Sequence, residues 1–292
     1  EPTPRMSAYI TNDTICDGDP VIISFASPTD ATTGINFNLE VLNPFPEITG
    51  YADINGLLIP DIYNENVSNS GDTARMITYI FTPYTLDGNN DQKCEGIRDT
   101  VRVWINPTPR VVPVIAEDRI CFEEATEVEI TSPTVMTHGI LKFDYTVTLT
   151  GEAGDLVGDE NSQNDLDPGY IISYNYDNTS DTVQSVYYNI TPRSVGTGCA
   201  AGPVNAAEVK VHPRPLQDII ITNPLTCNSN FDLALRAIVA EGTGPLSSHW
   251  TGAFGVDEYD VFEIDSLRGG RYTVQVTDNL GCTNTDFIES TK

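Results

Sequence analysis

The sequence predicts an all-β protein of three tandem β-sandwich domains, and three observations support this fold class. Motifs repeat at a fixed offset of 105 residues, short apolar segments alternate with a period of two, and Gly- and Pro-rich turns separate those segments. Repetition at a fixed period indicates repeated structural units. Alternation with a period of two is typical of strands that bury one face.

The first unit is recognised by motifs that recur in the second. Residues 2–5 read Pro-Thr-Pro-Arg, residues 15–16 read Ile-Cys, and residues 27–29 read Ser-Pro-Thr. The same motifs return at residues 107–110, 120–121 and 132–134, each 105 residues later. The repeat therefore places one domain at residues 1–108 and a second at residues 109–214, and it leaves residues 215–292 for a third.

In the first unit we expect strands at residues 14–16, 21–25, 35–41, 76–82 and 101–105. Residues 35–41 alternate strictly, which should place Ile35, Phe37, Leu39 and Val41 on one buried face. Residues 43–71 are rich in Pro, Asn, Gly and Ser and are predicted to be mostly loop.

The second unit repeats this plan, with strands expected at residues 128–130, 141–149, 170–172, 186–190 and 209–211 and an acidic loop at residues 151–169. The third unit alternates at residues 233–239 and 272–276. Short strands and frequent turns of this kind point to immunoglobulin-like sandwiches. The linkers are short and contain Pro, so they should be stiff. We expect an extended array, a monomer, with a length on the order of 100 Å.

The six cysteines fall two to a unit. Those of the first unit are 78 residues apart, as are those of the second, and those of the third are 55 apart. This internal symmetry predicts one disulfide within each unit: Cys16–Cys94, Cys121–Cys199 and Cys227–Cys282. Disulfides persist in oxidising locations, so an extracellular chain at the cell surface is expected.

The net charge of −27 restricts the classes of molecule that the chain is expected to bind. A field this negative repels nucleic acid and anionic lipid, so neither is an expected partner. No apolar run approaches the roughly 18 residues that span a bilayer, and membrane insertion is not expected. The sequence shows no signal peptide, and we interpret it as a piece of a larger secreted protein.

The third unit carries a longer pattern. Cys227 is followed by Gly-Thr-Gly-Pro at residues 242–245, by Trp250, and by Leu-Arg-Gly-Gly-Arg-Tyr-Thr-Val-Gln-Val-Thr-Asp-Asn-Leu-Gly-Cys at residues 267–282. This pattern resembles the SprB repeat of surface adhesins from gliding bacteria. It departs from that family at Leu246, where an aromatic residue is usual, and at the acidic residues 257–260. Trp250 is expected to pack on the disulfide of its unit.

The first two units resemble the PKD-like modules of the same adhesins, through Ile-Cys near the start and Ser-Pro-Thr after it. Together these resemblances imply a cell-surface adhesin that is exported by type IX secretion and takes part in gliding motility. They also imply that neighbouring repeats of a larger adhesin are its partners, with surface polysaccharide as a candidate ligand.

No motif in the sequence predicts an enzyme, so no catalytic residues and no cofactor-binding residues are assigned. No phosphate loop, nucleotide fingerprint or HExxH occurs. Clustered carboxylates offer oxygen ligands to calcium, and weak candidates lie in the acidic loop of the second unit: Asp155, Asp159, Glu160, Asp165 and Asp167. A second set of acids occupies equivalent positions near the start of the first two units: Asp13 with Asp118, and Asp19 with Glu124. For the acidic loop we favour solvated surface acids over a calcium site, and the second set is equally consistent with surface acids. We expect no site tighter than about millimolar.

The sequence therefore predicts a non-enzymatic adhesin fragment, made of stalk modules that support adhesion and gliding motility. The alternative is a carbohydrate-binding accessory region of a secreted polysaccharide-degrading protein. That alternative predicts an exposed aromatic platform, for which the natural residues are Tyr170, Tyr174, Tyr176, Tyr187 and Tyr188.

Overall fold

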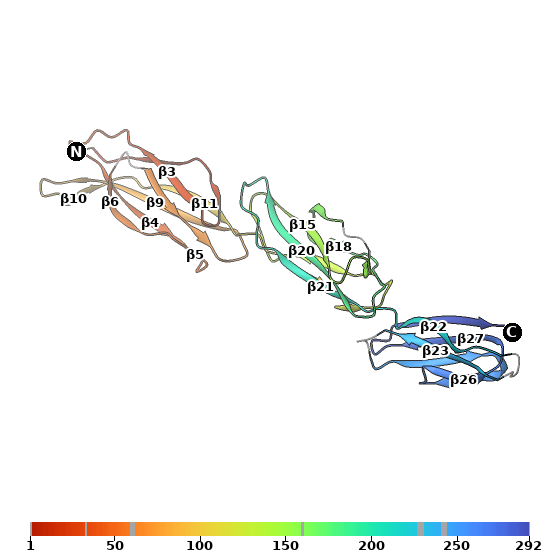
Figure 1. Cartoon of the computed structure of the whole chain (residues 1–292). Coiled ribbons are helices and arrows are strands. Elements are labelled where there is room, and N and C mark those ends of the chain that lie inside the picture. Colours follow the sequence, from red (N-terminus) through yellow and green to blue (C-terminus); the bar gives the residue numbers. More distant parts are fainter. Residues whose placement is uncertain are drawn as a thin grey trace.

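In a computed structural model of the chain, residues 2–32, 34–58, 62–158, 161–226, 231–240 and 244–291 are described. Three β-sandwiches follow one another in a rod, with the N-terminus at one end and the C-terminus at the other (Figure 1). We call them units one, two and three; they hold strands β1–β11, β12–β21 and β22–β28. Within the described residues, no helix is long and apolar enough to cross a membrane.

Unit one is a sandwich of two sheets. The smaller sheet has the strand order β1-β3-β7 and the larger has β2-β11-β9-β4-β6, with β10 added beside β9. Strand β2 pairs with β11 in parallel, and the other pairs of these sheets are antiparallel. The strands are β1 (Ser7–Ile10), β2 (Thr14–Cys16), β3 (Pro20–Ala26), β4 (Asn36–Leu42), β5 (Ile48–Thr49), β6 (Ile54–Leu58), β7 (Ile62–Asn66), β8 (Ser68–Asn69), β9 (Arg75–Leu86), β10 (Gln92–Glu95) and β11 (Asp99–Asn106).

Unit two has the same plan. Its sheets have the orders β12-β14-β18 and β13-β21-β20-β15-β17, and β13 again pairs in parallel with the last strand. A small ribbon joins β16 to β19. The strands are β12 (Val112–Ile115), β13 (Arg119–Ile120), β14 (Val128–Thr131), β15 (Ile140–Leu149), β16 (Leu156–Val157), β17 (Gln163–Leu166), β18 (Ile171–Ile172), β19 (Asp177–Asn178), β20 (Gln184–Val195) and β21 (Asn205–Val211).

Unit three is smaller, with sheets β22-β23-β26 and β25-β24-β27-β28. In each unit a three-stranded sheet faces a larger sheet, in which β9, β20 or β27 pairs with the last strand of the unit on one side and with an earlier strand on the other. This is the immunoglobulin-like topology that the sequence predicts. The elements are β22 (Leu216–Asn223), β23 (Leu233–Val239), β24 (Ser247–Gly252), a 3₁₀ turn (Ala253–Gly255), β25 (Val256–Tyr259), β26 (Glu263–Leu267), β27 (Gly270–Thr277) and β28 (Thr283–Ser290).

Each unit has its own apolar core, and the alternating segments supply it. Phe37 and Leu39 of β4, Phe143 of β15 and Val274 of β27 are all buried between their sheets. The loop prediction for residues 43–71 is wrong in part, because β5 to β8 lie there. Those strands are short, and polar residues such as Asn64, Ser68 and Asn69 hide the period-two signal that would identify them.

Two of the repeated motifs, Pro-Thr-Pro-Arg and Ser-Pro-Thr, are hydrogen-bonded to each other within units one and two. In unit one the backbone N–H of Arg5 donates to the Thr29 hydroxyl at 3.0 Å, and the Ser27 hydroxyl donates to the carbonyl of Arg5 at 2.7 Å. In unit two, Arg110 makes the same two bonds with Thr134 and Ser132, at 2.9 and 2.6 Å. The Ser-Pro-Thr motif therefore fastens the Pro-Thr-Pro-Arg segment to the sandwich at the start of each of these units.

Candidate functional site

The two junctions between the units are the candidate functional site, because both are covalently bridged. Cys16 of unit one is bonded to Cys199 of unit two, with 5.4 Å between the Cα atoms. Cys121 of unit two is bonded to Cys282 of unit three, again with 5.4 Å between the Cα atoms. Each pair of consecutive units is thus connected twice, once by the peptide linker and once by a disulfide.

The four bonded cysteines occupy two repeated positions. Cys16 is the last residue of β2, and Cys121 is the first residue after β13. Each begins a tight turn, which we call the exit turn of its unit. Cys199 and Cys282 lie in the loop of what we call the last hairpin, formed by β20 and β21 in unit two and by β27 and β28 in unit three. Each bridge therefore runs from the exit turn of one unit to the last hairpin of the next.

The exit turn has the same internal bonds in both units. The N–H of Cys16 donates to the Asp19 carboxylate at 3.3 Å, and the N–H of Cys121 donates to the Glu124 carboxylate at 2.9 Å. In return, the N–H of each acid donates to the carbonyl of its cysteine. These acids, which the sequence offered as junction calcium ligands, hold the cysteine in place in the structure.

A buried asparagine closes the same end of units one and two. The Asn69 side chain donates to the carbonyls of Thr73 and Ile105, at 3.0 and 2.9 Å. Asn178 makes the equivalent bonds in unit two, to Thr182 and to Val211, both at 2.8 Å. The sequence reasoning missed this pair, although the two asparagines recur at the offset of 109 that also relates residues 81–84 to 190–193.

The first junction adds backbone pairing to the disulfide. Ala74 donates its N–H to the carbonyl of Val135, and Val135 donates to the carbonyl of Asp72, both at 2.7 Å. The Thr14 hydroxyl lies 2.8 Å from the Nδ1 of His138, and Arg110 pairs with Asp72 at 3.0 Å. Units one and two are therefore joined by main-chain, polar and ionic contacts around the bridge.

The second junction is built around an acid beside the bridge. Asp278 is buried, and its carboxylate accepts the N–H groups of Leu280 and Cys282, both at 2.9 Å. Its other oxygen lies 2.9 Å from the Nδ1 of His212, which is buried in the linker that follows unit two. Arg214, further along that linker, pairs with Asp177 and Glu123 of unit two. Asp278 thus connects the loop that carries Cys282 to the preceding unit.

The prediction of one disulfide inside each unit is wrong. The bridges at Cys16 and Cys121 leave their own unit, and Cys94 is a free thiol. Cys227 lies outside the described residues. Trp250 is fully buried in the core of unit three, as expected, but it packs among apolar residues and donates to the carbonyl of Val261 at 3.0 Å. The bridge expected beside it does not form, because Cys282 is bonded to Cys121.

The calcium candidates of unit two do not gather in the described residues. Asp165 is paired with Arg193 and Asp167 with Lys142, and Asp155 accepts the N–H of Glu152 at 2.8 Å. Asp159 and Glu160 lie outside the described residues. Within the described residues, the one group with metal-ligand spacing is His212, Asp278 and Cys282, and the sulfur of Cys282 is already in a disulfide.

The aromatic platform required by the carbohydrate-binding alternative is not formed by its expected residues. Tyr176 and Tyr188 are fully buried in the core of unit two. Tyr170 and Tyr174 are half-buried, and both are bonded through their hydroxyls to Gln163. Tyr187 is also half-buried and donates to Glu208 at 2.9 Å. These tyrosines stabilise the sandwich instead of presenting their faces to a sugar.

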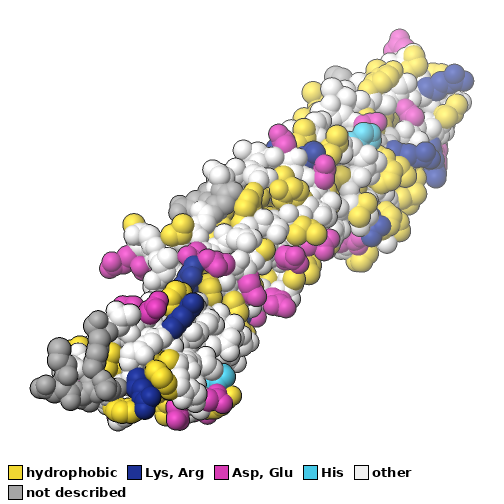
Figure 2. All heavy atoms as spheres, turned by 90° about the vertical axis from the view of Figure 1, so that its right-hand side faces the viewer, with side chains coloured by type: hydrophobic (Ala, Val, Ile, Leu, Met, Phe, Trp, Pro, Cys, Tyr) yellow, Lys and Arg dark blue, Asp and Glu magenta, His cyan; other side chains and the backbone are white. Residues whose placement is uncertain are grey.

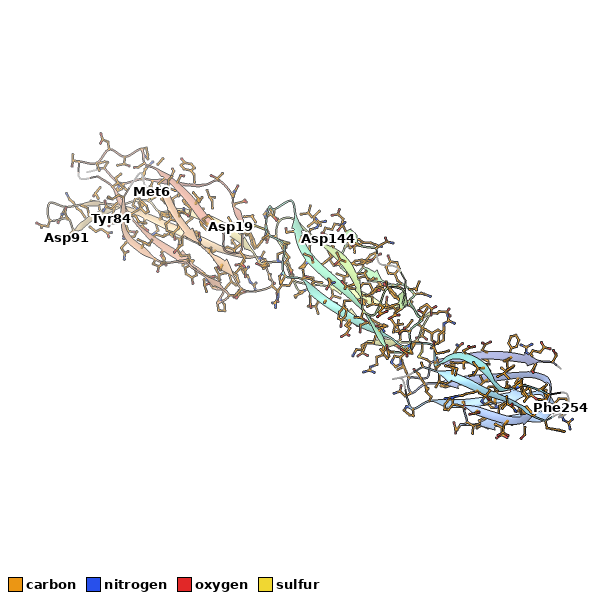
Figure 3. The ribbon with its side chains drawn as sticks, in the orientation of Figure 1. Met6, Asp19, Tyr84, Asp91, Asp144 and Phe254 are labelled. Atoms are coloured by element: carbon orange, nitrogen blue, oxygen red, sulfur yellow. A yellow bond between two sulfur atoms is a disulfide. The ribbon has the colours of Figure 1, made fainter. Side chains whose placement is uncertain are left out.

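The far end of unit three is open and partly aromatic. A pocket of about 570 Å³ lies there, and the guanidinium of Arg268 lies 4.2 Å from the ring centre of Phe231 and 4.8 Å from that of Phe254. Phe254 is at the C-terminal end of the rod (Figure 3). The side chains that line the pocket are Leu225, Phe231, Phe254, Arg268, Ser290 and Thr291.

No family model matches the sequence, and no curated protein matches it. Among solved structures, the FN1–FN3 domains of chicken CNTN1 are 12% identical, with a TM-score of 0.34 and coverage of 99% of both chains. FdeC, an adhesin of Escherichia coli, is 15% identical, with a TM-score of 0.34 and coverage of 98% of this chain and 97% of that chain. At these scores the comparisons carry no argument, and the fold assignment depends on the sheet topology described above.

Proposed function

We propose that this chain is a force-transmitting stalk segment of a cell-surface adhesin, without enzymatic activity, that supports adhesion and gliding motility. The observation that carries the proposal is the double connection at each junction, a peptide linker together with a disulfide. The resemblance of residues 267–282 to the SprB repeat supports the finer part, an adhesin exported by type IX secretion.

A double connection changes how a junction responds to force. Two domains that share only a peptide linker are free to move relative to each other unless a large interface holds them. A disulfide set apart from the linker adds a second fixed point, so the two units cannot separate or twist freely about the first. An array with such junctions keeps its length under load and holds a distal adhesive surface away from the cell.

The bridges also limit how far the chain extends if its units unfold. The shortest covalent path runs from residue 1 to Cys16, across to Cys199, back to Cys121, across to Cys282, and on to residue 292. That path contains about 100 residues, which extend to about 350 Å, against about 1000 Å for the whole chain. A bridged stalk therefore stays short even when a unit fails.

The surface fits an extracellular position. Acidic side chains are scattered along the rod in Figure 2, without one dominant patch on that face. A high net negative charge keeps extended proteins soluble and apart from one another. Disulfides are stable in oxidising locations, which include the outside of the cell.

Force spectroscopy on the oxidised chain tests the proposal, with the chain held at its two ends. We expect a fully unfolded length of about 350 Å for the oxidised chain and about 1000 Å after reduction. The control is the Cys94→Ser variant, which should behave as the natural chain does. A full extension near 1000 Å for the oxidised chain would show that the bridges do not carry load.

A glycan array separates the stalk from the carbohydrate-binding alternative. A stalk segment should bind none of the immobilised sugars, whereas a lectin-like module should bind one class. In the producing bacterium, in-frame removal of residues 109–211 should leave secretion intact and slow gliding. Unchanged gliding would contradict the motility part of the proposal alone.

A further inference from the structure

Each junction pairs a cysteine of an exit turn with a cysteine of a last hairpin, and in unit one the cysteine of the last hairpin is not bonded. Cys199 and Cys282 each lie in a last hairpin, and each is bonded to the exit turn of the preceding unit. Unit one has a last hairpin too, formed by β9 and β11 with β10 between them, and it carries Cys94 on β10. Cys94 is partly exposed and has a free thiol.

Local contacts identify Cys94 as the counterpart of Cys199. In unit one, the N–H of Gly96 donates to the carbonyl of Pro83 at 2.7 Å, and in unit two Gly202 donates to Pro192 at 2.9 Å. Both glycines lie under the leading segment of their unit. An added Cβ would lie 2.1 Å from the carbonyl oxygen of Pro4 at Gly96, and 1.7 Å from that of Pro109 at Gly202. Each cysteine precedes its glycine by two or three residues, so both sit on the same part of the hairpin.

The two ends of unit one are distinct. Asp91, in the turn that leads into β10, lies at the N-terminal end of the rod, and Asp19, in the exit turn, lies beside unit two (Figure 3). Figure 1 places β10 at that same N-terminal end. Cys94 is therefore presented where a preceding unit would dock, as Cys199 is presented to unit one.

A second observation at this hairpin is an unpartnered hydroxyl. Thr85 is opposite Cys94 in the β9–β10 register, it is fully buried, and its Oγ1 has no hydrogen-bond partner. In unit two the equivalent residue is Ser194, whose hydroxyl lies 2.7 Å from that of Thr197, and Thr197 accepts the N–H of Cys199 at 3.1 Å. A buried hydroxyl without a partner is destabilising, because it loses its hydrogen bonds to water and gains none in the folded protein. The Ser194 hydroxyl, in the hairpin with the bonded cysteine, has a hydrogen-bond partner, whereas the Thr85 hydroxyl, in the hairpin with the free cysteine, has none.

We propose that Cys94 is the receiving cysteine of a further interdomain disulfide, made with the exit turn of another sandwich unit of this kind docked on the N-terminal end of unit one. The partner is defined by its chemistry: an Ile-Cys dipeptide at the end of a short edge strand, with an acid three residues later that accepts the cysteine N–H, as in Cys16 with Asp19 and Cys121 with Glu124. This inference deepens the proposed stalk function by naming how the array continues.

The bond forms by thiol–disulfide exchange with a low-molecular-weight disulfide such as oxidised glutathione. The thiolate of one cysteine attacks the small disulfide and releases one reduced thiol, and the second cysteine then attacks the mixed disulfide and releases another. Two protons and two electrons leave the cysteine pair, and the small disulfide accepts them.

The test is a four-unit chain in which a copy of residues 2–106 is inserted before Pro2, so that the 105-residue period is kept. In the inserted copy Cys94→Ser removes the competing thiol. The protein is oxidised in a glutathione buffer and mapped by non-reducing peptide mass spectrometry. We expect a linked peptide that joins the inserted copy's Cys16 to the original Cys94. We also expect alkylation of that Cys94 to fall at least tenfold relative to the natural chain.

Two controls make the result decisive. Cys16→Ser in the inserted copy should return Cys94 to full alkylation, and the bridges Cys16–Cys199 and Cys121–Cys282 in the same digest report that the original units are folded. A second chain carries a copy of residues 107–211 instead, with Cys199→Ser, so that its exit cysteine is Cys121. A free or glutathionylated Cys94 in both extended chains overturns the inference. That outcome would leave the proposed stalk function standing, because the force measurement depends only on the two bridges already present.

Discussion

The carboxylate of Asp278 lies 2.9 Å from the Nδ1 of His212, and neither side chain is open to solvent. Asp278 belongs to the last hairpin of unit three, and His212 belongs to the linker after unit two. The same carboxylate holds the N–H of Cys282, so one acid serves both the loop with the bridge and the interface beside it. Removing it should therefore loosen the hairpin and the junction together.

Asp278→Ala should destabilise unit three and its junction by about 3 kcal/mol or more, because it leaves His212 and two backbone N–H groups without their buried partner. Thermal unfolding of the oxidised protein measures the effect. The matched control is Asp286→Asn, which changes an exposed acid on β28 of the same hairpin and should shift stability by less than about 0.5 kcal/mol. Equal stabilities for the two variants would show that Asp278 does not organise this junction.

Loss of a bridge should bend the rod without unfolding its units. Cys16→Ser combined with Cys199→Ser removes the second connection at the first junction, while the core of each unit is untouched. Small-angle scattering should then show a broader distribution of interatomic distances with a shorter mean. Cys94→Ser is the control and should leave the scattering curve as it is. A curve that is identical for the double variant and the natural chain would show that the noncovalent contacts alone hold the junction.

The disulfide pattern shows what the repeat could and could not predict. The 105-residue offset correctly indicated that Cys16 and Cys121 have equivalent roles, because both lie in exit turns and both are bonded to the next unit. It did not decide between a bridge within each unit and a bridge from each unit to the next, since both schemes obey the same translation along the chain. The choice depends on where each cysteine lies in its folded sandwich and on which ends of neighbouring sandwiches meet. Both are properties of the tertiary structure, which the repeat offset does not describe. Asn69 and Asn178 were predictable from their offset, whereas His138 and Asp278 were not, because their partners belong to another unit.

Asn178→Ala should destabilise unit two by about 2–3 kcal/mol, since the carbonyls of Thr182 and Val211 would lose their buried donor. Urea unfolding, followed by hydrogen exchange of β21, measures this. Asn189→Ala removes a bond to Thr148 on the exposed face of the same unit and should change stability by less than about 0.5 kcal/mol. If the two variants were equally stable, the role assigned to Asn178 at this end of the unit would be wrong.

Two acids should give pH responses of opposite sign. Burial raises the pKa of Glu65 above its ordinary value of 4.5, although a hydrogen bond from the backbone of Ala52 opposes this. Because the folded protein favours the protonated form of Glu65, this side chain stabilises the fold fully below its unfolded pKa. That stability is lost as the pH rises through the folded pKa. Glu65→Gln keeps an acceptor for the Tyr63 hydroxyl and should therefore raise the melting temperature at pH 7, with no gain at pH 4.

For Asp144, partial burial acts to raise the pKa, but hydrogen bonds from Arg193 and from the N–H of Asp165 outweigh it and hold the pKa below its ordinary value of 3.8. The stabilising contribution is present above the unfolded pKa and is lost as the pH falls through the folded one. Asp144→Asn should lower the melting temperature at pH 7 and should have a shrinking effect as the pH falls below 3.8. Thermal melts of both variants from pH 3 to pH 7 check the two signs, and a common sign would contradict this account.

Calcium should not bind tightly to the acidic loop of unit two. An ion at Asp165 and Asp167 would have to displace Arg193 and Lys142, which already neutralise these carboxylates. A ligand that binds only the folded state raises the melting temperature by mass action, whereas screening of surface acids is reproduced by sodium at equal ionic strength. We expect millimolar calcium and matched sodium to give the same melting temperature. A shift of several degrees that is specific to calcium, and that disappears in the Asp165→Asn and Asp167→Asn double variant, would establish a site here.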